Sequence, residues 1–145
     1  MGRSLKMLWV VSLVLTPALT PAYADDQDVI DYRQHIMSTL QAQSAALGQI
    51  LSYAVPDDNV VAHLDAIALT ASTALKAFEP KVQGGEAKPE VWSDWADFSK
   101  RMNEFAQMTE AMARTAHEQG QEAALEQVID ALSCKSCHDI YQNKK

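Results

Sequence analysis

After residue 27, apolar side chains recur every three or four positions along the chain, which is the spacing of one face of an α-helix. The pattern falls into four segments and predicts helices over residues 28–54, 59–78, 89–118 and 121–141. No segment shows the convincing alternation of apolar and polar residues that indicates a half-buried strand. Because four helices with short links favour antiparallel neighbours, the sequence predicts an all-α fold, an antiparallel up-down-up-down four-helix bundle.

Prolines and one glycine mark the ends of these segments. Pro56 and Pro80 each end a predicted helix, because proline lacks the backbone N–H that a helix interior needs. Pro89 suits the first position of the third helix, and Gly120 is a suitable C-terminal stop for it. Residues 80–88 are then the one long loop that the pattern predicts after the N-terminal segment.

The last segment presents two different faces. Its first half carries an apolar face made of Leu125, Val128, Ile129 and Leu132. Its second half carries, roughly opposite, the side chains of Cys134, Cys137, His138 and Tyr141. Either one straight helix shows different sectors to its neighbours along its length, or the helix bends near residues 131–133. The pattern leaves both alternatives open.

The first 24 residues have the features of a secretory signal peptide. Arg3 and Lys6 give a basic start, an apolar run follows over residues 7–15, and Ala-Tyr-Ala at 22–24 matches an A-x-A cleavage site. The apolar run is too short to span a bilayer, although an uncleaved anchor helix is the alternative reading. We expect cleavage before Asp25, which leaves one domain over residues 25–145 and no membrane anchor.

Charge narrows the classes of partner. Without Arg3 and Lys6 the chain keeps ten basic and 19 acidic residues, a formal net charge of −9. Such a chain does not suit nucleic acid or anionic membrane surfaces, and it fits a soluble protein that meets a basic partner. Export together with two cysteines indicates an oxidising compartment, and we expect the periplasm.

The pattern Cys134-x-x-Cys137-His138 is that of covalent haem c attachment. Two thiols can add to the two vinyl groups of a porphyrin, and the adjacent imidazole can bind the iron. On a helix these three side chains share one sector. A redox dithiol, half of a zinc site or a disulfide are the alternatives, since C-x-x-C alone also occurs in those settings. The directly following histidine and the absence of further cysteines favour haem.

Other reactive side chains show no catalytic arrangement. His35, His63 and His117 lack partners at ligand spacing, and we expect them at the surface. Asp57 and Asp58 suit turn and cap chemistry rather than an acid/base pair. The sequence contains no Gly-rich phosphate loop and no convincing Ser-His-Asp set, so we expect that the protein is not an enzyme.

Three pieces of the chain together resemble the cytochrome c′ family, the four-helix class of c-type cytochromes. The first is Val-Ile-Asp-Tyr-Arg-Gln at 29–34 with Met37, and the second is Gly-Gly-Glu-Ala-Lys-Pro-Glu-Val-Trp-Ser-Asp at 84–94. The third is Cys-Lys-Ser-Cys-His-Asp at 134–139 with Tyr141. The position of the third piece, near the C-terminus after three helices, selects this class among c-type cytochromes.

The resemblance implies one haem c per chain, covalently bound through Cys134 and Cys137, with His138 as the proximal iron ligand. It also implies a periplasmic homodimer that packs through the helices at 28–54 and 59–78.

Four polar residues are placed near the haem by the same resemblance. Arg33 and Gln34 would lie at the propionate edge, and Glu86 and Lys88 would approach the haem edge. The positive charges of Arg33 and Lys88 suit haem propionates on chemical grounds as well. A solvated surface arginine is the alternative for Arg33.

Met37 corresponds to the family position that covers the distal face of the iron. It is either a sixth ligand, as in low-spin relatives, or a hydrophobic lid over a five-coordinate iron. Gln142 departs from the arginine that commonly follows Tyr141 at this place in the family, and this departure puts family gas chemistry on the proximal side in doubt. Asp130 and Leu132 also depart from the usual pattern.

Two functions follow from the resemblance. The first is electron transfer with periplasmic redox partner proteins through Fe(II)/Fe(III) cycling. The alternative is the binding or sequestration of nitric oxide, or of carbon monoxide, at a five-coordinate iron. A haem-free dithiol oxidoreductase, the third possibility, requires a βαβ setting that this helical pattern does not offer.

Overall fold

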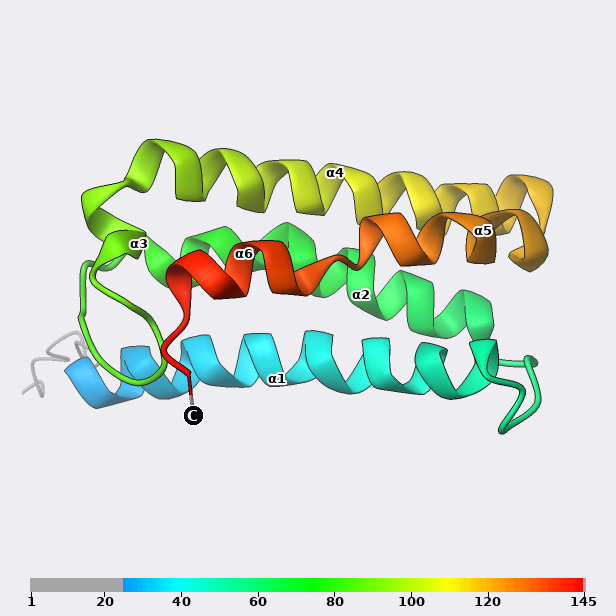
Figure 1. The fold of residues 1–145 in the computed structure, drawn as a ribbon, viewed down its shortest axis with the longest axis horizontal. Coiled ribbons are helices and arrows are strands. Elements are labelled where there is room, and N and C mark those ends of the chain that lie inside the picture. The colour runs from blue at the N-terminus through cyan, green and yellow to red at the C-terminus, as the bar shows by residue number, and fades with distance from the viewer. Residues whose placement is uncertain (1–24, 145) are drawn as a thin grey trace, which may run out of the picture.

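The computed structural model describes residues 25–144, and these form a bundle of four helical stretches (Figure 1). The helices are α1 Asp26–Leu51, α2 Val60–Ala74 with the 3₁₀ turn η1 Leu75–Phe78, α3 Glu90–Ser93, α4 Trp95–Gln119, α5 Gln121–Ala131 and α6 Cys134–Tyr141. Successive stretches run in opposite directions in Figure 1, as predicted. From residue 25 to residue 144 there is no strand, only two isolated bridges. The predicted signal peptide lies outside the described residues.

Helical spacing places one side of each stretch in a common core. The largest fully buried side chains come from α1, α2, α3 and α4 and are Leu47, Leu64, Ile67, Met112, Val60, Val91 and Thr109. Burial of one such aliphatic side chain contributes about 1.5–3 kcal/mol. This shared core fixes the α1–α2–α4 frame against which the last stretch packs.

The start of α1 is set by a capping box. The side chain of Asp25 accepts a hydrogen bond from the backbone N–H of Asp28 at 2.8 Å, and Asp28 accepts one from the Asp25 N–H at 3.3 Å. This pair satisfies two otherwise unpaired donors, so α1 begins two residues before the predicted start.

The end of α1 lies three residues before the predicted one, because Tyr53 adopts the left-handed backbone conformation, with φ of 57°. The Tyr53 N–H donates to the Ile50 carbonyl at 2.9 Å, and the Ala54 N–H donates to the Gln49 carbonyl at 2.9 Å. These two bonds make a Schellman motif, which usually uses glycine at this position.

The third and fourth predicted helices are each interrupted once. Asp94 has φ of −118° and ψ of 48°, which separates the short α3 from α4. Leu132 and Ser133 separate α5 from α6, so the bend that was one of two alternatives is present. The expected apolar face of α5 is partly wrong, since Val128 is 4% exposed whereas Ile129 is 78% exposed.

One helical stretch between residues 25 and 144, Val60–Phe78, is long and apolar enough by length and composition to cross a membrane. A core helix passes the same test, and here Val60, Leu64 and Ile67 are fully buried in the bundle.

Candidate functional site

The predicted attachment residues form the first turns of α6, the last helix of the bundle. Cys134 and His138 are exposed and Cys137 is half-buried, where it packs against the core. Both cysteines are free thiols. Figure 1 shows that α6 runs along the half of the bundle that also holds the first part of α1, the α3 turn and the long loop.

The C-terminal end of α6 is joined to α4 by Tyr141. Its ring is 4% exposed and meets Phe98 edge-on, with ring centroids 5.1 Å apart and planes at 77°. Its hydroxyl donates to Asp97 Oδ2 at 2.6 Å, and the same oxygen accepts a bond from Arg101 Nε at 2.5 Å. One carboxylate oxygen therefore links a helix α4 cation to the α6 phenol.

These contacts shift the pKa values of Tyr141 and Asp97 in opposite directions. Desolvation first, and then the hydrogen bond to Asp97, raises the pKa of Tyr141 to about 12. The hydrogen bond from Arg101, followed by that from Tyr141, lowers the pKa of Asp97. At neutral pH the pair is therefore a neutral phenol donating to a carboxylate.

Lys88 ties the other side of α6 to the long loop. Its backbone N–H donates to the Tyr141 carbonyl at 2.9 Å, and its Nζ donates to the carbonyls of Asp139 at 3.1 Å and Ile140 at 3.2 Å. These carbonyls belong to the last turn of α6. The carbonyls of a last turn have no hydrogen-bond partners within their own helix, and a cation near them stabilises the helix end.

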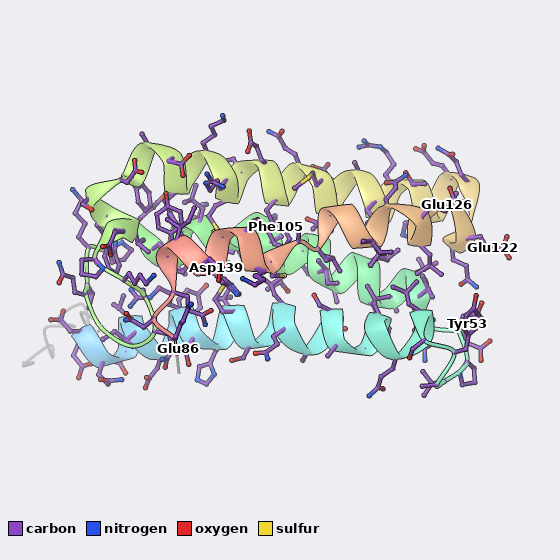
Figure 2. The ribbon with its side chains drawn as sticks, in the orientation of Figure 1. Tyr53, Glu86, Phe105, Glu122, Glu126 and Asp139 are labelled. Carbon is purple, nitrogen blue, oxygen red and sulfur yellow. The ribbon has the colours of Figure 1, made fainter. Side chains whose placement is uncertain are left out.

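Glu86 makes the next connection between the loop and the C-terminal segment. Its carbonyl accepts from the Asn143 N–H at 2.8 Å, and its carboxylate accepts from Gln142 Nε2 at 2.7 Å. Figure 2 shows Glu86 and Asp139 at the same end of the bundle. Gln142, which stands where the family commonly has arginine, is thus engaged with the loop.

Arg33 is buried, with 3% exposure, so the alternative of a solvated surface arginine is wrong. Its guanidinium donates to the carbonyls of Val82 and Gly84, each at 3.0 Å. It also lies over the rings of Phe78 and Trp92, at 5.4 and 5.1 Å from their centroids. Burial lowers the pKa of Arg33. Its contact with a haem propionate stays a prediction.

Gln34 lies half-buried beneath the two loop glycines. Gly85 has φ of 61°, and a Cβ there would lie 2.8 Å from Gln34 Nε2 and 2.9 Å from a methyl carbon of Ile30. Gly84 has φ of 135°, and its Cβ would lie 2.6 Å from Ile30 Cδ1. The loop therefore needs glycine both for its backbone conformation and for its close approach to α1.

Met37 lies on α1, one turn beyond Arg33, and packs half-buried against the core. The roles of iron ligand and of hydrophobic lid both stay predictions for Met37.

The donor set on α6 fits a haem c. Two free thiols three residues apart and an exposed imidazole next to the second are the groups that thioether attachment and iron ligation need. Partial burial raises the pKa of both the Cys134 and the Cys137 thiol, so both are protonated at neutral pH. Among residues 25–144, no three His, Cys, Asp or Glu side chains gather closely enough to hold a metal ion together.

Asp97 and Arg101 are site residues that the sequence analysis missed. Their spacing of four on one helix is a visible signal for an ion pair. Their contact with Tyr141 follows only when the phase of α6 is known, and the sequence left that phase open.

Two of the remaining histidines, His63 and His117, contact residues outside the motif. His117 is exposed and meets Asp65 at 2.9 Å, as expected for a surface histidine. His63 is half-buried and lies 2.6 Å from Gln43 Oε1. A hollow of about 270 Å³ beside His63, at the α1–α2 turn, is therefore unrelated to the attachment residues.

Comparison with known proteins gives a consistent match along most of the chain. The sequence profile of the family described as Cytochrome C′ matches residues 28–142. Cytochrome c′ of Alcaligenes xylosoxydans xylosoxydans is 27% identical over 127 residues, which cover 85% of this chain and 99% of that protein. Cytochrome c′ of Rubrivivax gelatinosus is 29% identical over 124 residues, with 81% and 95% covered.

A solved structure shares the fold as well. It is the nitrosyl complex of a variant of cytochrome c prime from Alcaligenes xylosoxidans, with a TM-score of 0.76 and 25% identity. The match covers 85% of this chain and 100% of the chain in that structure.

Proposed function

This chain belongs to the cytochrome c′ family, a family that binds haem c, and we propose that it is a periplasmic electron carrier. The observation that carries the proposal is the motif on α6: Cys134 and Cys137 are free thiols, and His138 beside them is exposed. The role proposed is that of a carrier and not of an enzyme.

Cys134 and Cys137 would hold the group covalently. Each thiol would add across one vinyl double bond of the haem, with a carbon–sulfur bond formed and the thiol proton transferred to the neighbouring carbon. No oxidant or reductant is consumed in this addition. The bound haem supplies an iron that exchanges one electron between Fe(III) and Fe(II).

His138 would give its neutral imidazole to the iron. The bonds from Tyr141 to Asp97 and from Lys88 to the last turn of α6 hold the helix that carries it. A carrier benefits from such a fixed helix, because an iron ligand that keeps its position lowers the reorganisation on electron exchange.

Met37 would complete or cover the distal side. As a sulfur ligand it would keep the coordination constant through the redox cycle and would raise the potential. As a half-buried apolar lid it would exclude water instead.

The raised pKa of both thiols argues against a haem-free dithiol oxidoreductase. Catalytic dithiols have a cysteine whose pKa is lowered, because the thiolate is the nucleophile. Here burial raises the pKa of both Cys134 and Cys137.

Nitric oxide binding is the second candidate function. A nitrosyl complex exists for the variant of the Alcaligenes xylosoxidans relative, whose fold this chain shares. If Met37 only covers the iron here, a small diatomic ligand such as nitric oxide or carbon monoxide could take the distal position.

Export and pairing of chains belong to the same proposal. Cleavage of the predicted signal peptide before Asp25 would deliver the chain to the periplasm, and mass spectrometry of the mature N-terminus tests this. A homodimer would pack through α1 and α2, whose outer faces carry the exposed side chains of Tyr32 (54%) and Leu69 (72%). Leu69→Asp should then shift the protein to monomer in sedimentation, while Ile129→Asp on α5 should not.

The test is the optical spectrum of the protein made together with haem-maturation machinery, oxidised and reduced, with and without nitric oxide. A low-spin spectrum that Met37→Ala converts to high spin, with rapid electron exchange, supports the carrier. A high-spin spectrum in the unchanged protein that responds to nitric oxide supports gas binding and overturns the carrier with fixed ligands. The absence of covalent haem overturns both.

A further inference from the structure

Helices α4 and α6 meet where Tyr141 contacts Asp97 and Phe98. The Tyr141 hydroxyl donates a hydrogen bond to Asp97 at 2.6 Å. One turn later on α4 stands Arg101, and one turn earlier on α6 stands Cys137, because both steps are four residues. The two helices run in opposite directions (Figure 1), so Arg101 and Cys137 each lie one turn from the Asp97–Tyr141 contact, in the same direction along the bundle.

The position of Arg101 is fixed by its ion pair with Asp97. Its Nε donates to Asp97 Oδ2 at 2.5 Å, and that carboxylate is itself held by the phenol of Tyr141. Because Arg101 and Cys137 each lie one turn from the same contact, the cation is held beside the turn of α6 that carries Cys137 and His138.

We propose that the ion pair of Arg101 and Asp97 tunes the reduction potential of the haem from helix α4, with Arg101 stabilising Fe(II) and Asp97 stabilising Fe(III). The inference rests on the proposed function, because it needs a haem attached at Cys137. In this account Tyr141 is a positioning residue, since it acts only through Asp97.

The direction of each effect follows from the charge of the iron. Oxidation adds one positive charge to the haem, so a nearby cation disfavours Fe(III) and a nearby anion favours it. Because Arg101 is always charged, its contribution does not depend on pH in the ordinary range. Both side chains are more than a third exposed, at 38% and 37%, so solvent reduces the size of each effect.

The test is a spectroelectrochemical titration of the holoprotein at pH 7 and low salt. Arg101→Gln should lower the ratio of reduced to oxidised protein at a fixed potential by about threefold, which is about 28 mV for a one-electron couple. Asp97→Asn should change the ratio in the opposite direction, and the double variant should return it toward that of the unchanged protein. High salt should shrink all three shifts.

The matched control is the neighbouring pair of Lys100 and Glu104 on the same helix, which is 3.7 Å apart and more exposed. Lys100→Gln and Glu104→Gln should leave the ratio within the error of the measurement. A purely structural role of Arg101 predicts shifts of the same sign, or none, for Arg101→Gln and Asp97→Asn, and either result overturns the inference. If the unchanged protein carries no covalent haem, the proposed function fails too, and the absorption spectrum shows this first.

Discussion

Helices α5 and α6 follow one another along one side of the bundle, yet they are held there by different forces. α5 is held by apolar packing, since Ala124, Val128 and Ala131 are at most 7% exposed. α6 buries only Tyr141 and is held at its C-terminal end by the hydrogen bond that Tyr141 donates to α4 and by those that it accepts from the loop at 80–89.

This difference divides the last helical stretch into an apolar half and a half that carries the attachment motif. Polar links at Tyr141 and Lys88 set the position of α6 while its first turn stays exposed. Substitutions that remove polar links should therefore disturb α6, and substitutions that remove apolar volume should disturb α5.

The largest effect is expected for Arg33→Met, which cuts the loop away from α1. The carbonyls of Val82 and Gly84 lose their donors, and an unsatisfied buried polar group costs about 1–3 kcal/mol. We expect urea unfolding to show a loss of about 3 kcal/mol. The exposed Arg114→Met should change stability by less than about 0.5 kcal/mol. Equal effects of the two variants would contradict the role of Arg33.

Val128→Ala tests the apolar side of the comparison. Val128 is 4% exposed, and removal of two buried methyl groups should lower the free energy of unfolding by about 2 kcal/mol. Its neighbour Ile129 is 78% exposed, so Ile129→Ala is the control and should cost less than about 0.5 kcal/mol. The haem spectrum should stay unchanged in both, and a changed spectrum in Val128→Ala would show that α5 and α6 are not separate.

Tyr141→Phe tests the polar side of the comparison. It keeps the ring that meets Phe98 but removes the bond to Asp97, a hydrogen bond to a charged group, so the loss should be about 1.5 kcal/mol at pH 7. We expect the spectrum of the haem to change here, because the helix that carries His138 loses its link to α4. Tyr32→Phe on the exposed face of α1 is the control.

The pH dependence of stability should report the same bond. The pKa of Tyr141 is raised from 10.0 to about 12, so the folded protein favours the neutral phenol. The resulting stabilisation is complete below about pH 10 and is lost as the pH rises toward 12. Chemical unfolding at pH 9 and pH 11.5 should show a larger loss in the unchanged protein than in Tyr141→Phe. An equal loss of stability between pH 9 and pH 11.5 in the two proteins would contradict the assignment of this pH dependence to Tyr141.

The smallest effect is expected at the far end of the bundle, where Figure 2 shows Tyr53 at the α1–α2 turn. Tyr53 has φ of 57° and is 95% exposed, so Tyr53→Gly relieves strain without losing a contact. We expect stability to rise by about 1 kcal/mol in thermal unfolding. Tyr53→Ala keeps the strained conformation and should leave stability nearly unchanged, and both α5 and α6 should be unaffected. Equal stabilities of Tyr53→Gly and Tyr53→Ala would contradict backbone strain at residue 53.

The four helical stretches followed from the sequence because three-and-four spacing and Pro56, Pro80 and Pro89 are local signals. The early end of α1 did not follow, because Tyr53 adopts a conformation that usually belongs to glycine. The break at Leu132 and Ser133 carries no proline or glycine, and only the conflict between the two faces of the last segment indicated it.

For the site, the attachment motif itself followed from the sequence, since its members are adjacent. The contact of Asp97 with Tyr141 depends on the rotation of α6 after the break, which no local pattern reports. The burial of Arg33 by the loop depends likewise on how Gly84 and Gly85 approach α1.

The central claim is that α6 carries a covalent haem, and the intact mass of the denatured protein tests it most directly. The chain made with haem-maturation machinery should gain the mass of one haem, and Cys134→Ala with Cys137→Ala should gain none. His138→Ala should keep the thioether bonds where attachment occurs but lose the iron ligand. An unchanged protein that has the mass of the bare chain would contradict the account.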